Sequence, residues 1–377
     1  MSTNALYRHF EDSGEWARSR RRPFSRAVRW AKVNLFSSAF NTILTLLSAA
    51  LLYAIASPIV GWALLDATFS GSSRAACTSD GACWTFVAVH LNQFLFGYYP
   101  PEEQWRVLAV LGLFISGLAA VAISGWRYKA VLALGSMVLV PVAAYYLLYG
   151  GGLSGLPVVG TDRWGGLTLT LLVAVSGISM AFPLGVLLAL GRRSRKPVVR
   201  LLSVIYIEVS RSVPMITVLF MASLMLPLFM PGDMTVDKLV RALIGIAIFN
   251  AGHVAEVVRG GLQAVPRGQY EAAAALGHRL HLQMLLVILP QALTISIPGL
   301  VGTFISLLKD TSLLVVIGLF DLLGVAQSAV SDPAWLGFSA EGYVFIAALF
   351  WVMCFAMSKY SRKLERRLGV HAPRLDL

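Results

Sequence analysis

Long apolar stretches constrain this chain more than any other feature of its sequence. Of its 377 residues, 57% are hydrophobic and only 13% are charged. A stretch of about 20 apolar residues forms a helix that crosses a bilayer, because backbone polar groups in lipid must be bonded within the helix. We therefore expect an all-α integral membrane protein with about eight transmembrane helices, near residues 40–64, 106–124, 130–149, 167–190, 200–229, 239–258, 284–307 and 341–358.

Positive charge falls in alternate loops of this topology. The formal net charge is +12, and 24 of the 31 lysines and arginines lie before the first span, at 127–129, in 191–200, in 259–281 and after residue 358. Cytoplasmic loops are enriched in such residues, so both termini are predicted to be cytoplasmic. The same distribution explains the charge without a nucleic-acid partner.

One further apolar stretch, 311–330, could be drawn as a ninth span. A ninth crossing would place the basic residues after 358 on the outer side, against the charge rule. We therefore expect 311–330 to form a helix that lies in, or dips partly into, the outer side of the membrane.

The predicted external loop between the first two spans holds Cys77 and Cys83. An oxidising periplasm permits a disulfide between them. The alternative, two free thiols, stays open from the sequence alone.

A polar island separates two apolar spans at residues 259–290, RGGLQAVPRGQYEAAAALGHRLHLQMLLVILP. Its alanine-rich middle favours a short helix, and Gly277 is placed to end that helix. Three consecutive alanines leave a thin rod, and Arg267 and Glu271 bring charge to its start. The pattern predicts a projecting element that fits a socket on a cytoplasmic partner.

This island also carries a resemblance. Glu271-Ala272-Ala273, then three residues, Gly277, nine residues and the sequence VILP at 287–290 resemble the EAA loop of ABC importer permeases, with Val287 where isoleucine is common. Flanking residues 259–263 and 307–313 look like the polar amino acid branch of that family. The resemblance covers 166–362 and implies a five-helix type I importer core, whose loop docks on an ATPase. The docking residues implied are Arg267, Glu271, Ala272, Ala273 and Gly277.

Three spans before such a core resemble the larger permease of general L-amino acid importers of the Aap/Bzt type. That likeness implies a bacterial inner-membrane permease that receives polar L-amino acids from a periplasmic binding protein. The implied partners are a dimer of ATPase subunits, which bind ATP and Mg, and a second, different permease; a homodimer is the alternative. No phosphate-binding GxxxxGK[ST] occurs, so we expect no ATP hydrolysis, no cofactor and no enzyme activity in this chain.

The chain accordingly divides into four expected segments. Residues 1–38 form a basic cytoplasmic segment, either lying on anionic lipid or simply a disordered tail that enforces topology. Residues 39–165 form an N-terminal extension with three spans and a periplasmic loop, 166–362 form the permease core, and 363–377 form a cytoplasmic tail.

Charged and polar residues inside the core spans need an explanation, because each charge at a helix centre costs about 2.5 to 3.5 kcal/mol on insertion scales. Glu208 and Arg211 share a helix face and either pair with each other or border the translocation path or its gate. His253 and Glu256 form a second polar stripe, where His253 fits an interhelical hydrogen bond or tunes substrate choice. We expect no metal site. An ion-coupled secondary carrier, with these four residues as coupling groups, is the alternative function.

Overall fold

The computed structural model describes residues 23–77, 80–123, 126–152, 155–229, 231 and 236–368, and these residues form helices joined by loops, with no strand among them. The chain divides into two compact units. The first holds the residues up to Phe69 and a short return segment that ends at Ala82; the second holds 70–77 and the residues from Cys83 onward. The first 22 residues of the expected basic segment and the last nine of the expected tail lie outside the described residues.

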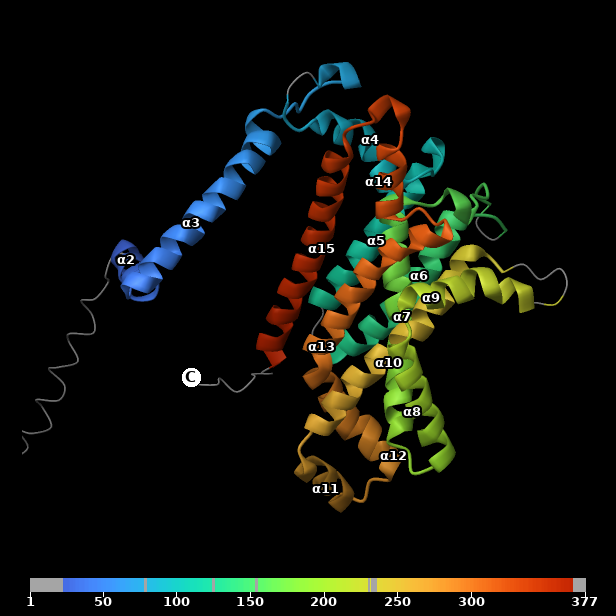
Figure 1. Cartoon of the computed structure of the whole chain (residues 1–377). Helices are drawn as coiled ribbons and strands as arrows, with labels where there is room; N and C mark the ends of the chain where they lie inside the picture. The colour runs from blue at the N-terminus through green and yellow to red at the C-terminus, as the bar shows by residue number, and fades with distance from the viewer. Residues whose placement is uncertain are drawn as a thin grey trace, which may run out of the picture. The chain divides into compact units, whose positions relative to one another are not determined.

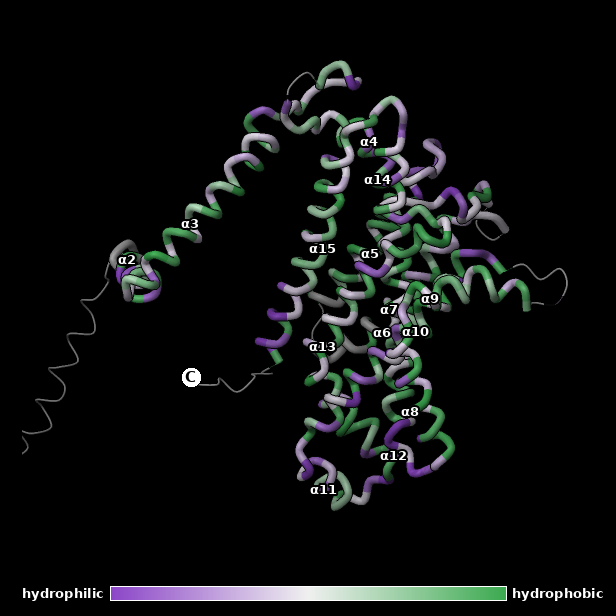
Figure 2. Tube along the Cα trace, viewed as in Figure 1, coloured by the Kyte–Doolittle hydropathy of each residue, from purple (hydrophilic) through white to green (hydrophobic). Residues whose placement is uncertain are grey.

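The first unit contains two helices. Helix α2 spans Pro23–Asn34, and α3 spans Ala39–Val60 and continues through a π-helical turn, η2, at Gly61–Leu65. Helix α3 begins where the Ser38 hydroxyl accepts a hydrogen bond from the Asn41 N–H. None of its residues is buried in the structure, and its surface is apolar along most of its length (Figure 2). A helix that is apolar all round is suited to hydrocarbon rather than water.

The second unit is a bundle built around α10 (Figure 1). Helix α10 packs along α7 and α13, while α15 packs on α13. Helices α4 and α14 lie at one end of the bundle, and α11 and α12 lie at the other. The helices are α4 (Trp84–Phe96), α5 (Gln104–Ile123), α6 (Trp126–Tyr149), α7 (Gly166–Arg192), α8 (Pro197–Ser212), α9 (Met215–Phe220), α10 (Lys238–Ala264), α11 (Arg267–Ala275), α12 (Leu280–Leu282), α13 (Leu289–Asp310), α14 (Leu322–Val330) and α15 (Ser339–Leu368).

Glycines let α10 approach its neighbours closely. A methyl group on Gly185 of α7 would lie 2.5 Å from Val254 Cγ1 on α10. A methyl group on Gly261 of α10 would overlap the Ala292 carbonyl oxygen on α13. Small residues at such crossings allow the backbone contact that associates helices in membranes, where the hydrophobic effect between helices is absent.

The expected span at 200–229 forms two helical runs with a sharp bend between them. Helix α8 ends at Ser212, and the helical run Met215–Phe229 that follows is bent from it by 104°. Val213 has an extended backbone, with ψ of 137°, as the residue before a proline prefers. Pro214 therefore turns the chain sharply inside an apolar region.

The exact number of spans stays a prediction. Among the described residues, six helices are long and apolar enough to cross a membrane, and the bent pair makes a seventh if it is one span. Helix α6 has 24 residues, of which Gly135–Tyr149 form a shorter apolar helix that is not among these six.

No ninth crossing forms in the region of residues 311–330 that the structure describes. That region holds a 3₁₀ helix, η9 (Thr311–Ile317), and then α14, which has nine residues. Nine residues rise only about 14 Å in an α-helix, less than half of the hydrocarbon core. Helix α14 is instead buried among α4, α7 and α15.

The α10–α13 contact can be tested with neighbouring glycines on one helix. We expect Gly261→Ala to destabilise the protein by about 1–3 kcal/mol, because the new methyl overlaps α13. Gly260→Ala is the control: no atom lies within 4 Å of its added methyl, and it should be neutral or stabilising by up to about 1 kcal/mol. Melting temperatures in one detergent measure both, and equal shifts would contradict this packing.

Candidate functional site

Helix α11 is the polar element predicted from the sequence, and its ends have clear physical causes. It begins directly after Pro266, whose ring is compatible with a helix start. Its last residue is Ala275, and the N–H of the next residue, Leu276, donates to the Ala272 carbonyl at 3.1 Å. Gly277 then takes a left-handed conformation with φ of 75°, which glycine adopts without strain. The short helix expected in the alanine-rich middle of residues 259–290 thus corresponds to α11, and Gly277 follows its end.

The residues expected to dock on an ATPase divide between two faces of α11. Ala273 is buried, with 2% of its surface exposed, and it anchors the helix to its own protein. Arg267, Glu271, Ala272 and Gly277 are exposed. Of the five expected docking residues, these four are therefore placed to meet another molecule directly.

Leu276, directly after α11, adds an apolar residue to this exposed surface, since 76% of its surface is exposed. Sequence reasoning had not singled it out. A large exposed apolar residue at the end of a short projecting helix is a suitable anchor for a partner's pocket.

Arg193, at the end of α7, ties α11 to the bundle. Its Nη1 donates to the Leu262 carbonyl at 3.1 Å and to the Tyr270 hydroxyl oxygen at 2.7 Å. The Tyr270 hydroxyl donates to the same Leu262 carbonyl at 2.9 Å, and the Arg193 guanidinium lies 5.3 Å from the Tyr270 ring centre. We call Arg193, Tyr270 and Leu262 the α11 tether. From the sequence, Arg193 was only one of several topology-setting charges, and Tyr270 was a single aromatic in a polar stretch.

A side chain of α13 makes a second polar contact with α11. Gln291 Nε2 donates to Gln269 Oε1 at 3.0 Å and to the Val287 carbonyl at 2.9 Å. Helix α11 is therefore bonded to the ends of three helices, α7, α10 and α13. Displacement of α11 would therefore pull on the ends of all three helices.

A cluster of charges lies where α7, α8 and α10 meet. Glu256 is its centre: the Arg259 Nε donates to Glu256 Oε2 at 2.9 Å, and the Arg259 Nη2 donates to the other oxygen. Arg192 and Arg211 approach Glu256 Oε2 within 3.6 and 3.8 Å. Glu208 pairs with Arg192 at 3.1 Å. We call these five residues the charge cluster.

The cluster changes two of the sequence interpretations. Glu208 and Arg211 do not pair with each other across one turn of α8; each pairs with a residue on another helix instead. His253 lies near the cluster in sequence, but its Nδ1 is 3.3 Å from the Phe249 carbonyl on its own helix. The expected interhelical hydrogen bond of His253 is thus replaced by one within α10.

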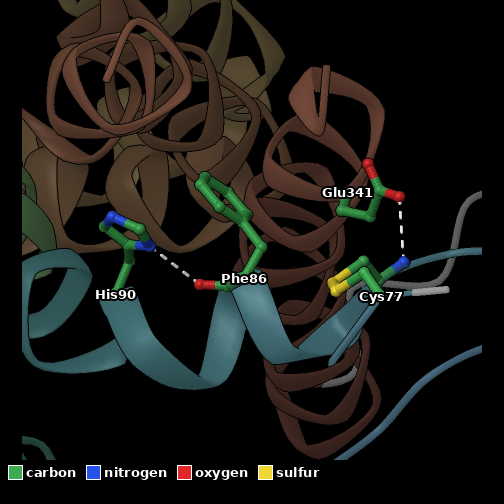
Figure 3. The surroundings of a disulfide bond; sticks show 5 residues. Cys77, Phe86, His90 and Glu341 are labelled. Carbon is green, nitrogen blue, oxygen red and sulfur yellow. Dashed lines mark hydrogen bonds between the residues drawn. A yellow bond between two sulfur atoms is a disulfide. The ribbon is translucent and has the colours of Figure 1, made fainter. Parts of the chain in front are cut away.

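At the opposite end of the bundle from α11, a disulfide joins Cys77 to Cys83 (Figure 3). The Glu341 carboxylate, at the start of α15, accepts a hydrogen bond from the Cys83 N–H at 3.0 Å. His90 Nδ1 lies 2.9 Å from the Phe86 carbonyl, which fixes the ring on α4. This end of the molecule therefore links the beginning of the second unit to its last helix.

Comparison with known proteins identifies the family. Residues 181–370 match the model of the binding-protein-dependent transport system inner membrane component. The chain is also 51% identical over 352 residues to the inner membrane amino-acid ABC transporter permease protein YhdY of Escherichia coli (strain K12), covering 92% of this chain and 94% of that protein. The chain belongs to this permease family. The resemblance found in its sequence, and the all-α membrane fold that it implied, are confirmed.

Two further relatives extend the comparison. The permease is 38% identical over 414 residues to the glutamate/glutamine/aspartate/asparagine transport system permease protein BztC of Rhodobacter capsulatus, covering 91% of this chain and 94% of that protein. A solved structure titled "Crystal structure of an amino acid ABC transporter with histidines" aligns with a TM-score of 0.48 and 33% identity, over 54% of this chain and 92% of that one.

Family membership makes this chain the membrane permease subunit of an ABC importer, a multi-span inner-membrane protein. Its role is transport, and ATP hydrolysis belongs to a separate subunit. The ion-coupled secondary carrier is accordingly not retained.

The charge cluster can be tested through its central carboxylate. Glu256→Gln removes the one negative charge shared by three arginines, and we expect it to destabilise the permease by about 2 kcal/mol. Glu208→Gln is the control, because Glu208 is 56% exposed and pairs with one arginine, so its loss should cost less than about 1 kcal/mol. Thermal unfolding in detergent compares them. A larger effect at Glu208 would refute the central role of Glu256.

The disulfide gives a second prediction. A closed loop as short as that between Cys77 and Cys83 stabilises by about 2 kcal/mol at most. The double variant Cys77→Ser, Cys83→Ser should therefore have a slightly lower melting temperature than the wild type. A reductant should not lower its melting temperature further. Cys354→Ser, which removes the free cysteine, is the matched control and should still respond to reductant. Equal melting of wild type with and without reductant would count against a stabilising bond.

Proposed function

We propose that this permease imports polar L-amino acids, delivered by a periplasmic binding protein, and that a separate ATPase drives it through α11. The observation that carries the proposal is the tethered, projecting α11, with Arg267, Glu271, Ala272 and Leu276 exposed on it. An element that must transmit movement has to be rigidly joined to the helices it moves. The α11 tether and Gln291 provide that joint.

The orientation of the permease follows from its charges. The end of the bundle that carries α11 also carries the basic turn 191–200 and Arg267, while the disulfide lies at the other end. We infer that the α11 end and both termini are cytoplasmic and that the disulfide end faces the periplasm.

Coupling would work through rigid connection. ATP and Mg, held by two ATPase subunits, would draw the subunits together, and the sockets around α11 would move with them. Because α11 is bonded to the ends of α7, α10 and α13, that movement would shift α7 and α10, two of the three helices whose charges meet in the charge cluster. A change from about 1:99 to 99:1 between two states needs about 5.5 kcal/mol of differential binding, which ATP can supply. Glu208, Arg211, His253 and Glu256 would border the path or its gate.

Substrate and partners are assigned by likeness. The names of the two full-length relatives specify amino acids, and one specifies glutamate, glutamine, aspartate and asparagine. We therefore propose a range of polar and acidic L-amino acids for this permease. A second, different permease subunit is the proposed membrane partner, with a homodimer as the alternative.

The docking role of α11 can be tested at Gly277. Because its φ is 75° and no atom lies within 4 Å of an added Cβ, Gly277→Val strains only the backbone that ends α11. A strain of about 1–2 kcal/mol would weaken ATPase association roughly five- to thirty-fold. The measurement is uptake of labelled glutamate and glutamine by cells with the complete transporter, and co-purification of the ATPase, at matched membrane abundance.

Gly268→Val is the control, since Gly268 lies within α11, has no positive φ and has no atom within 4 Å of an added Cβ. It should retain most uptake. If both variants import normally while the ATPase no longer co-purifies, α11 is not the coupling element and the proposal falls.

A further inference from the structure

A cavity of about 540 Å³ lies beside α11, between the end of α7, the start of α8 and the α12 region. Four residues of its lining are basic, namely Arg193, Arg195, Lys196 and His281. Most of the others are apolar, with Leu190, Met284 and Leu285 among them. The described lining contains no carboxylate. We call this cavity the basic pocket.

The basic residues of the pocket are not neutralised by the protein. Among the described residues, no Asp or Glu oxygen lies within 4.0 Å of a side-chain nitrogen of Arg193, Arg195 or Lys196. The arginines of the nearby charge cluster, by contrast, all pair with Glu208 or Glu256. Concave, uncompensated positive charge raises the local concentration of anions.

The apolar residues of the pocket favour anions that carry an apolar part. Leu280 and Leu285 are more than half exposed, and Leu286, next to the pocket, is 63% exposed. The apolar part of the lining thus continues, through Leu285 and Leu286, onto an exposed apolar surface of the helical run that leads into α13. A small inorganic anion would use only the basic residues, whereas an amphiphile would use both the basic and the apolar residues.

We propose that the basic pocket binds the phosphate of an anionic phospholipid, with the acyl chains on the Leu285–Leu286 surface. The proposal rests on the inferred orientation, which places this pocket at the cytoplasmic face, where anionic lipids and basic pockets between helices meet. The ligand would also contact the α11 tether, because Arg193 and Tyr270 both line the pocket. Bound lipid would therefore hold α11 in its docking position.

Direct lipid binding tests this proposal. The complete transporter is purified in detergent and titrated with dioctanoyl phosphatidylglycerol, and bound lipid is counted by native mass spectrometry. Removing one basic residue near such a headgroup should weaken binding about five-fold. We expect that loss for Arg195→Gln and a larger one for Arg195→Gln with Lys196→Gln. Arg200→Gln is the matched control: it removes one exposed charge five residues away, outside the pocket, and should bind normally.

Two competitors define the ligand, namely dioctanoyl phosphatidylcholine and inorganic phosphate. Neither should displace phosphatidylglycerol. Displacement by inorganic phosphate would show a simple anion site, and equal binding by Arg195→Gln and Arg200→Gln would place the lipid elsewhere. Binding seen with the isolated permease but lost in the complex would show that the ATPase covers the pocket; each of these results overturns the proposal. Lipid counting requires no transport, so a failure of the proposed import function would be seen separately, in uptake.

Discussion

The structure of the core depends on how closely α10 approaches the helices on either side of it. Gly185 on α7, and Gly252 and Gly261 on α10, leave room only for hydrogen at these crossings, with Val254, Ser210 and Ala292 against them. Between apolar helices in lipid, association comes from such close packing rather than from hydrophobic burial. The polar features of the permease are arranged on this rigid centre. The charge cluster meets where α10 crosses α7 and α8, and the α11 tether forms where α10 ends.

Arg192 and Arg193 are adjacent in sequence, yet their side chains contact different parts of the permease. Arg192 turns toward Glu208 and Glu256, so it belongs to the region where the helices meet. Arg193 turns toward Leu262 and Tyr270, so it belongs to the docking element. Two adjacent residues at the end of α7 thus contact the exposed docking element and the charge cluster. A partner that displaced α11 would act on the charge cluster over a short and stiff path.

Local signals allowed several features to be predicted from the sequence. Hydropathy indicated the membrane helices, alanine content and Gly277 indicated α11 and its end, and charge distribution excluded a ninth span. The bend at Pro214 could have been anticipated from proline chemistry, but apolar residues on both sides masked it. The partners of Glu208, Arg211 and His253 could not be predicted, because each depends on how far one helix is rotated and shifted against another. Arg193 carried no local signal, since its acceptors are 69 and 77 residues away.

The hydrogen bond between Glu341 and the Cys83 N–H has a consequence for the order of assembly. Its two residues are separated by 258 positions, and α4, which directly follows Cys83, is buried against α14 and α15. A ribosome completes α4 long before it reaches Glu341. Until α15 has been made, α4 can pack only against α7 and α14, and the part of its surface that α15 covers stays exposed. A chain truncated before α15 would therefore expose apolar surface of α4, the kind of surface that makes incomplete folds prone to aggregation.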